Sequence, residues 1–80
     1  MTHADEVITL LLALRRMART NRAADLGTLA EELHWGVGRV VRVLAAAATK
    51  GLADRGRARL TWTGLAVATA LDARRASQAA

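Results

Sequence analysis

The spacing of apolar residues in the first quarter of the chain predicts a helix over residues 2–19. Thr2 or Asp5 can cap its start, and acidic residues in its first turn with arginines near its end suit the helix dipole. Its main apolar stripe consists of Val7, Leu10, Leu11, Leu14 and Met17, and the residues Ile8, Leu12 and Ala13 widen that stripe. Because one small core covers only part of such a surface, we expect a second copy of the chain to help cover it.

Two shorter helices are predicted next, with an interruption at residues 34–36 between them. Asp25 can cap the earlier helix, although Thr28 followed by Glu31 is an alternative start of the capping-box type. The later helix runs over residues 37–50. The inward positions of these two helices are Leu26, Leu29, Ala30 and Leu33, then Val40, Val43, Leu44 and Ala47.

After Gly51, which suits a left-handed helix cap, the apolar period shortens to that of a β-hairpin over residues 52–62. Gly56 lies inside a basic turn of this hairpin, and Leu60 and Trp62 alternate with Arg57, Arg59 and Thr61. Thr61 can cap a final helix that runs from Trp62 to about Ala76. The inward positions of that helix are Leu65, Val67 or Ala68, and Leu71.

Two strings in the second half of the chain resemble a known family. The string LAEELHWGVGRVVRVLAAAATKGL, residues 29–52, resembles without a gap the helix-turn-helix of bacterial winged-helix regulators such as the MarR family. The string LTWTG, residues 60–64, is similar to the "LTxxG" that leads such wings into the last helix. The resemblance implies a mainly α fold with a small β-hairpin, a winged helix-turn-helix with a three-helix core, a wing and a C-terminal helix.

One domain over residues 1–80 follows from this order of elements. The first helix and linker occupy residues 1–24, the helix-turn-helix 25–51, the wing 52–62, and the C-terminal helix and tail 63–80. The chain departs from the family at Gly36, where a capping hydroxyl is usual, and in lacking long flanking dimerisation helices. We therefore expect a homodimer formed through the first and last helices.

Basic residues outnumber acidic ones and give the chain a formal net charge of +5. The part from Gly36 onward carries +6 and the part before it −1, which favours an anionic partner such as nucleic acid. The chain has no cysteine, so thiolate chemistry and disulfides are excluded, and a reducing cytoplasm is the expected location. The longest apolar run is too short for a membrane span, and it follows acidic residues instead of a basic leader, so we expect no membrane partner.

Candidate DNA contacts fall into three groups. The first turns of the predicted recognition helix present two arginines for guanine and two valines for thymine methyl groups, at Val37, Gly38, Arg39, Val41 and Arg42. The hairpin offers Arg55, Arg57 and Arg59 to a minor groove or to the phosphate backbone, and Arg22, Thr28 and Lys50 are further phosphate contacts. The alternatives are an ordinary solvated helix face and an edge strand kept soluble by its charges.

Other side chains are assigned structural roles. Trp35 and Trp62 are expected to be packing anchors instead of stacking platforms for single-stranded bases. Glu31 and Glu32 fall on the solvent face of their helix, and His3 and His34 lack partners at metal-ligand spacing. We therefore expect no metal, no cofactor, no small-molecule ligand and no catalysis.

The sequence thus predicts a regulator that binds duplex DNA, acting as a repressor and as a dimer on a pseudo-palindrome. Two alternatives stay open. The apolar outward side of the third helix, at Val37, Val41 and Ala45, can instead dock on a protein partner. An architectural or replication-associated DNA binder with little base preference is the third possibility.

Overall fold

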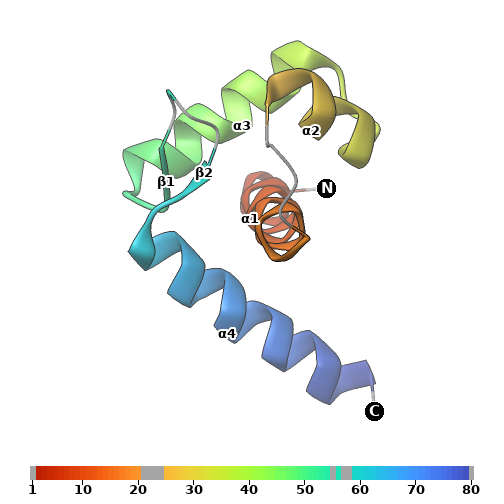
Figure 1. Cartoon of the computed structure of the whole chain (residues 1–80), viewed down its shortest axis with the longest axis vertical. Helices are drawn as coiled ribbons and strands as arrows, with labels where there is room; N and C mark the ends of the chain where they lie inside the picture. Colours follow the sequence, from red (N-terminus) through yellow and green to blue (C-terminus); the bar gives the residue numbers. More distant parts are fainter. Residues whose placement is uncertain (1, 21–24, 55, 57–58, 80) are drawn as a thin grey trace.

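The computed structural model of the chain describes residues 2–20, 25–54, 56 and 59–79 (Figure 1). This part is mainly helical and contains a small antiparallel hairpin, as the sequence predicts. Its elements are α1 (His3–Arg19), α2 (Leu26–Leu33), α3 (Val37–Thr49), β1 (Ala53–Asp54), β2 (Arg59–Leu60) and α4 (Trp62–Ala79). The helices begin and end within one residue of the sequence prediction, except that α4 continues to Ala79.

Helix α1 is the centre of the fold. Figure 1 shows it almost end-on, with α2 and α3 on one side and α4 on the other. The core of the described part consists of α1 side chains packed with Leu29, Ala30, Val40, Val43, Leu44, Ala47, Ala53 and Ala68, all of them buried. Leu12, on the wide apolar surface of α1, is also only 4 % exposed. Ile8 is half-buried, so the chain itself covers most of this helix, because α4 returns along the side that α3 leaves open. The expected contribution of a second copy stays a prediction.

The helix starts follow their capping residues. Thr2 caps α1 through a reciprocal pair of hydrogen bonds with Asp5, so both residues named in the sequence take part. Asp25 caps α2 by accepting from the backbone N–H of Thr28 at 2.7 Å, which selects Asp25 over the alternative start at Thr28. These hydrogen bonds lower the pKa of both aspartates.

The hairpin pairs Ala53 with Leu60 and Asp54 with Arg59. Ala53 is buried and Leu60 packs on the core, whereas Arg59 is exposed, so this strand alternates as the sequence predicts. Gly51, with φ of +73°, adopts the left-handed conformation that ends α3 and turns the chain into β1.

The junction between β2 and α4 is held by Thr61. Its hydroxyl donates to the carbonyl of Gly51 at 2.6 Å and accepts from the N–H of Gly64 at 3.0 Å, while its own N–H bonds the carbonyl of Leu52. Gly64 is buried here, and a Cβ built on it would overlap the Leu52 carbonyl. The LTWTG string therefore has a local structural reason: its threonine caps the helix and its glycine allows close contact with the chain after α3.

The burial of α4 residues corrects the expectation for Trp62 and decides between Val67 and Ala68. Trp62 is 88 % exposed, so the prediction that it is a packing anchor was wrong. It is the first residue of α4 and projects outward because the Thr61 cap directs Gly64 and Ala68 inward. Of the alternatives Val67 and Ala68, the buried residue is Ala68.

We expect Gly64→Ala to destabilise the protein by about 3 kcal/mol, because the added methyl group meets rigid backbone at Leu52 and overpacking of this kind costs that order of free energy. Urea unfolding followed by circular dichroism measures the change.

Gly38→Ala is the matched control, because a Cβ at Gly38 meets nothing within 4 Å and helical glycine costs roughly 0.5–1 kcal/mol against alanine. This variant should be at least as stable as the wild type. Equal stability of the two variants would contradict the close contact at Gly64.

Candidate nucleic-acid interface

Helix α3 has a buried side and an open side. Val40, Val43, Leu44 and Ala47 are buried against the core, as the sequence predicts. On the open side, Val37 is 50 % exposed and Val41 37 %, and Gly38 between them is exposed too. No acidic residue occurs between Gly36 and Lys50, so the side chains of α3 on this surface are small apolar ones, cations and the hydroxyl of Thr49.

Glu6 determines where the two arginines of α3 lie. This carboxylate, on the first turn of α1, is buried, and its Oε2 accepts from Arg39 Nε at 2.7 Å and from Arg42 at 3.1 Å. Such charge-assisted hydrogen bonds are among the stronger ones in proteins. One buried acceptor therefore fixes two guanidinium groups at the start of α3.

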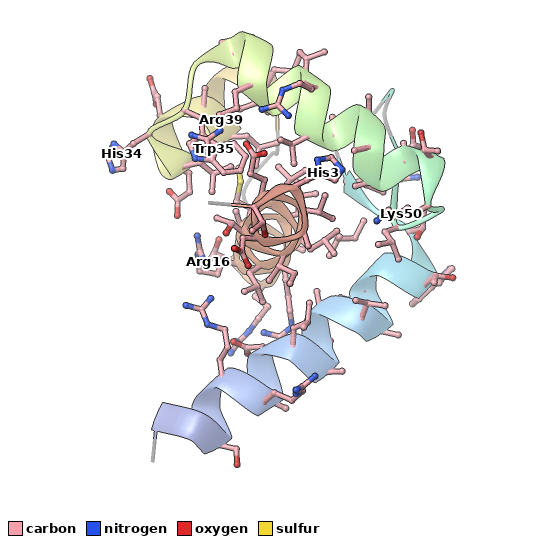
Figure 2. The ribbon with its side chains drawn as sticks, turned by 180° about the vertical axis from the view of Figure 1, so that it is seen from behind. His3, Arg16, His34, Trp35, Arg39 and Lys50 are labelled. Atoms are coloured by element: carbon pink, nitrogen blue, oxygen red, sulfur yellow. The ribbon has the colours of Figure 1, made fainter. Side chains whose placement is uncertain are left out.

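Arg39 is held a second time, by Trp35. Its guanidinium carbon lies 4.3 Å from the centre of the indole ring, in cation–π geometry. Figure 2 shows both side chains together beside α1, near the connection between α2 and α3. Trp35 also packs on the core, which confirms its predicted anchoring role. The Arg39 side chain is thus directed along the flank of α3 that adjoins α1.

Arg42 is the more accessible of the two arginines. Its side chain is 57 % exposed, against 38 % for Arg39. A guanidinium has five N–H donors, so contact with one carboxylate oxygen leaves donors for a second partner. Of the two predicted base readers, Arg42 is therefore the one whose geometry suits an external ligand better.

The pKa of the Glu6 carboxyl lies below its ordinary value of 4.5, first through the hydrogen bond from Arg39 and then through that from Arg42. Protonation of Glu6 would remove the negative charge that both arginines share. The stabilisation is therefore complete above pH 4.5 and disappears as the pH falls through the lowered pKa.

The remaining predicted contacts are spread over the molecule. Lys50 is exposed at the end of α3, and its position about three turns after Arg39 places it on the same side of the helix (Figure 2). Arg59 is exposed on β2, and Thr28 is half-buried in the first turn of α2. Arg22, Arg55 and Arg57 lie outside the described residues, so their predicted phosphate contacts stay predictions.

Several acidic side chains serve ion pairs between helices. Asp72 on α4 pairs with Arg15 at 2.8 Å, and Glu32 on α2 lies 3.7 Å from Arg16. Glu32 is half-buried, so its predicted solvent-facing position was wrong, whereas Glu31 is exposed as expected.

Over the described ranges no group of three or more His, Cys, Asp or Glu side chains is placed to hold a metal ion. No helix in those ranges is long and apolar enough to cross a membrane.

The role of Glu6 was not predicted from the sequence. From the sequence, Glu6 is only a first-turn acid suited to the helix dipole, and Arg39 and Arg42 are expected to face outward. The available signal was its position next to Val7 at the edge of the apolar stripe of α1. A carboxylate at that place is drawn into the packing between α1 and α3, and a buried charge needs a partner.

We expect Glu6→Gln to lower the urea midpoint of unfolding at pH 7, because a neutral amide oxygen can accept both hydrogen bonds but lacks the charge that strengthens them. The difference from the wild type should shrink as the pH falls from 4.5 through the lowered pKa of Glu6, because the wild-type carboxylate then becomes neutral as well.

Glu31→Gln, on the exposed side of α2, is the control and should leave the midpoint unchanged at both pH values. A Glu6→Gln deficit of equal size at pH 7 and at pH 3 would show that the charge of Glu6 plays no part.

Comparisons of the chain with protein-family models, with curated proteins and with solved structures found no match. The resemblance of residues 29–52 to winged-helix regulators therefore stays a prediction from those residues.

Proposed function

We propose that this chain is a winged helix-turn-helix regulator that binds duplex DNA, with α3 as its recognition helix. The observation that supports this most is the open side of α3, where Val37, Gly38, Val41 and Arg42 are exposed and no acidic residue occurs between Gly36 and Lys50. The major groove admits a helix, and its base edges and thymine methyl groups match cationic and small apolar side chains.

The glycines at the start of α3 agree with a closely approaching ligand. A Cβ at Gly36 or Gly38 would meet nothing within 4 Å, and neither residue has a positive φ. The fold itself therefore does not require glycine at these positions. The absence of side chains leaves the first backbone amides of α3 accessible to a phosphate group, which partly replaces the hydroxyl that the family usually places at Gly36.

We assign the two arginines different roles. Arg42 is the base-reading candidate because of its exposure, and Arg39, held between Glu6 and Trp35, positions the start of α3 and adds positive potential. Two further cations are phosphate contacts in this proposal: Lys50, which lies on the side of α3 that carries Arg39, and Arg59 on the hairpin.

Binding as a dimer follows from the proposal, since helix-turn-helix proteins pair on half-sites roughly 10 base pairs apart. Such a dimer would block an operator sterically and act as a repressor in the cytoplasm. No effector is needed for that mode of action.

A second candidate function is protein recognition by the same side of α3. It is favoured by the exposure of Val37 and Val41, two apolar side chains that a partner helix can cover. Ala45 is half-buried, so the apolar surface is narrower than the sequence suggests. The third alternative, DNA binding without base preference, uses the same cations and differs only in its response to random-sequence competitor.

We expect Arg42→Ala to weaken binding to a duplex selected from a random pool by roughly 5- to 150-fold, as loss of a bidentate base contact worth about 1–3 kcal/mol requires. Fluorescence anisotropy at fixed salt measures the affinity, and affinity should fall steeply as salt is raised.

Arg74→Ala is the matched control. Arg74 is exposed on α4, so this substitution removes the same positive charge at a place away from α3. Equal losses for the two variants would mean that only net charge matters. Protein recognition would be favoured by two results together: no duplex is selected from the random pool, and the Val41→Glu variant no longer binds a protein partner that the wild type binds.

A further inference from the structure

A carboxylate lies directly beneath the surface of α3 that the proposed function gives to DNA. Glu6 has a side chain that is only 9 % exposed, whereas the side chains of Arg39 and Arg42 both reach the surface. The two guanidinium groups donate to the same Glu6 oxygen, Oε2, at 2.7 and 3.1 Å. A single buried anion is thus shared by two cations of the candidate interface.

Stability alone gives no reason for a carboxylate at this position. A buried ion pair has a desolvation cost that the attraction between its members only roughly offsets, and a well-packed apolar residue is often as stable. Glu6 precedes Val7 at the edge of the apolar stripe of α1, where an apolar side chain would continue that stripe. The choice of an acid here therefore points to a role at the surface of α3.

Binding to any duplex and reading one sequence make different demands on an arginine. Contact with phosphates is electrostatic and carries no sequence information. Reading a base edge needs the guanidinium fork in a fixed plane, because two of its donors must align with two acceptors on guanine. An anion paired with Arg39 and Arg42 serves the second demand and opposes the first, since it orients both groups and lowers the positive potential that attracts phosphates.

Arg42 combines these two effects. It is held through one terminal nitrogen, Nη2, and its side chain is more than half exposed. A guanidinium has five N–H donors, so Arg42 can hold a base edge while it is paired with Glu6. Arg39 is restrained on a second side by the indole of Trp35, next to the start of α1 (Figure 2).

We propose that Glu6 is a positioning residue that gives the DNA surface of α3 its sequence preference: it orients Arg42 for a base edge and weakens binding to random-sequence duplex. This inference rests on the proposed function and deepens it, because it assigns specificity to a residue of α1 that does not itself contact DNA. Loss of the Glu6 charge should therefore strengthen binding to random duplex and reduce the preference for a selected one.

Glu6→Gln keeps the size of the side chain and removes its charge. Fluorescence anisotropy with a selected and a random-sequence duplex, between about 50 and 200 mM salt, measures both effects. The ratio of the two affinities should fall by roughly 5-fold or more, as disordering of one bidentate base contact requires. The slope of log affinity against log salt for the random duplex should become steeper by about one, as one more guanidinium–phosphate contact requires. Circular dichroism at the assay temperature checks that the variant is folded.

Asp5→Asn is the matched control. Asp5 is exposed on the same turn of α1 and bonds Thr2 instead of the arginines, so this substitution removes an equal charge and leaves the Glu6 contacts in place. Its affinity ratio and salt slope should equal those of the wild type. Equal changes in Glu6→Gln and Asp5→Asn would show that net charge sets the preference, and would overturn the proposal.

A double-mutant cycle with Arg42→Lys tests whether Glu6 acts through Arg42. Lysine keeps the positive charge and can pair with Glu6, but it lacks the planar fork. Adding Glu6→Gln to Arg42→Lys should therefore change the affinity ratio much less than Glu6→Gln does alone. The same fold-change in both backgrounds would show a purely structural effect of Glu6 and would overturn its positioning role.

The outcomes separate this inference from the proposed function. A wild type that prefers the selected duplex, with a Glu6→Gln variant of unchanged preference and salt slope, would refute the inference alone. A wild type without preference for any duplex would refute sequence-specific binding and the inference together.

Discussion

The fold depends on covering α1, a helix that is apolar around most of its circumference. Helices α2 and α3 cover one side and α4 the other, and the chain reverses between them through the short hairpin. That reversal requires the close contact between Gly64 and Leu52 and the three hydrogen bonds of Thr61. A few residues at the junction thus allow α4 to cover the side of the central helix that α2 and α3 leave open.

The same central helix links stability to the surface of α3. Glu6 is the one charged residue among the buried side chains of the described part, and it is neutralised by Arg39 and Arg42 from α3. A buried carboxylate is costly unless it is paired, so both arginines are drawn to it. The pairing reduces the positive charge available to a ligand, and in return it orders two long side chains that would otherwise lose rotamer entropy on binding.

Helical periodicity and capping residues were sufficient to predict the helices, because the apolar stripes of α1 and α3 and the caps at Thr2, Asp25 and Thr61 act locally. The errors concern contacts between distant segments. Nothing near Glu6 in sequence shows that α3 will present two arginines to it. Alternation along β2 placed Trp62 inward, but the strand ends at Leu60 and the helical turn points Trp62 to the solvent. The burial of α1 by α4 depends on the chain reversal at the hairpin, which the periodicity of apolar residues cannot predict.

The central claim is that the open side of α3 meets duplex DNA. Backbone amide resonances of the isotope-labelled protein, followed during titration with a duplex selected from a random pool, test it most directly. The account predicts saturable shifts at Val37, Gly38 and Val41 and at Arg42, with the exposed residues of α4 near Arg74 unaffected. Shifts confined to α4, or no saturable change at any residue of α3, would contradict it.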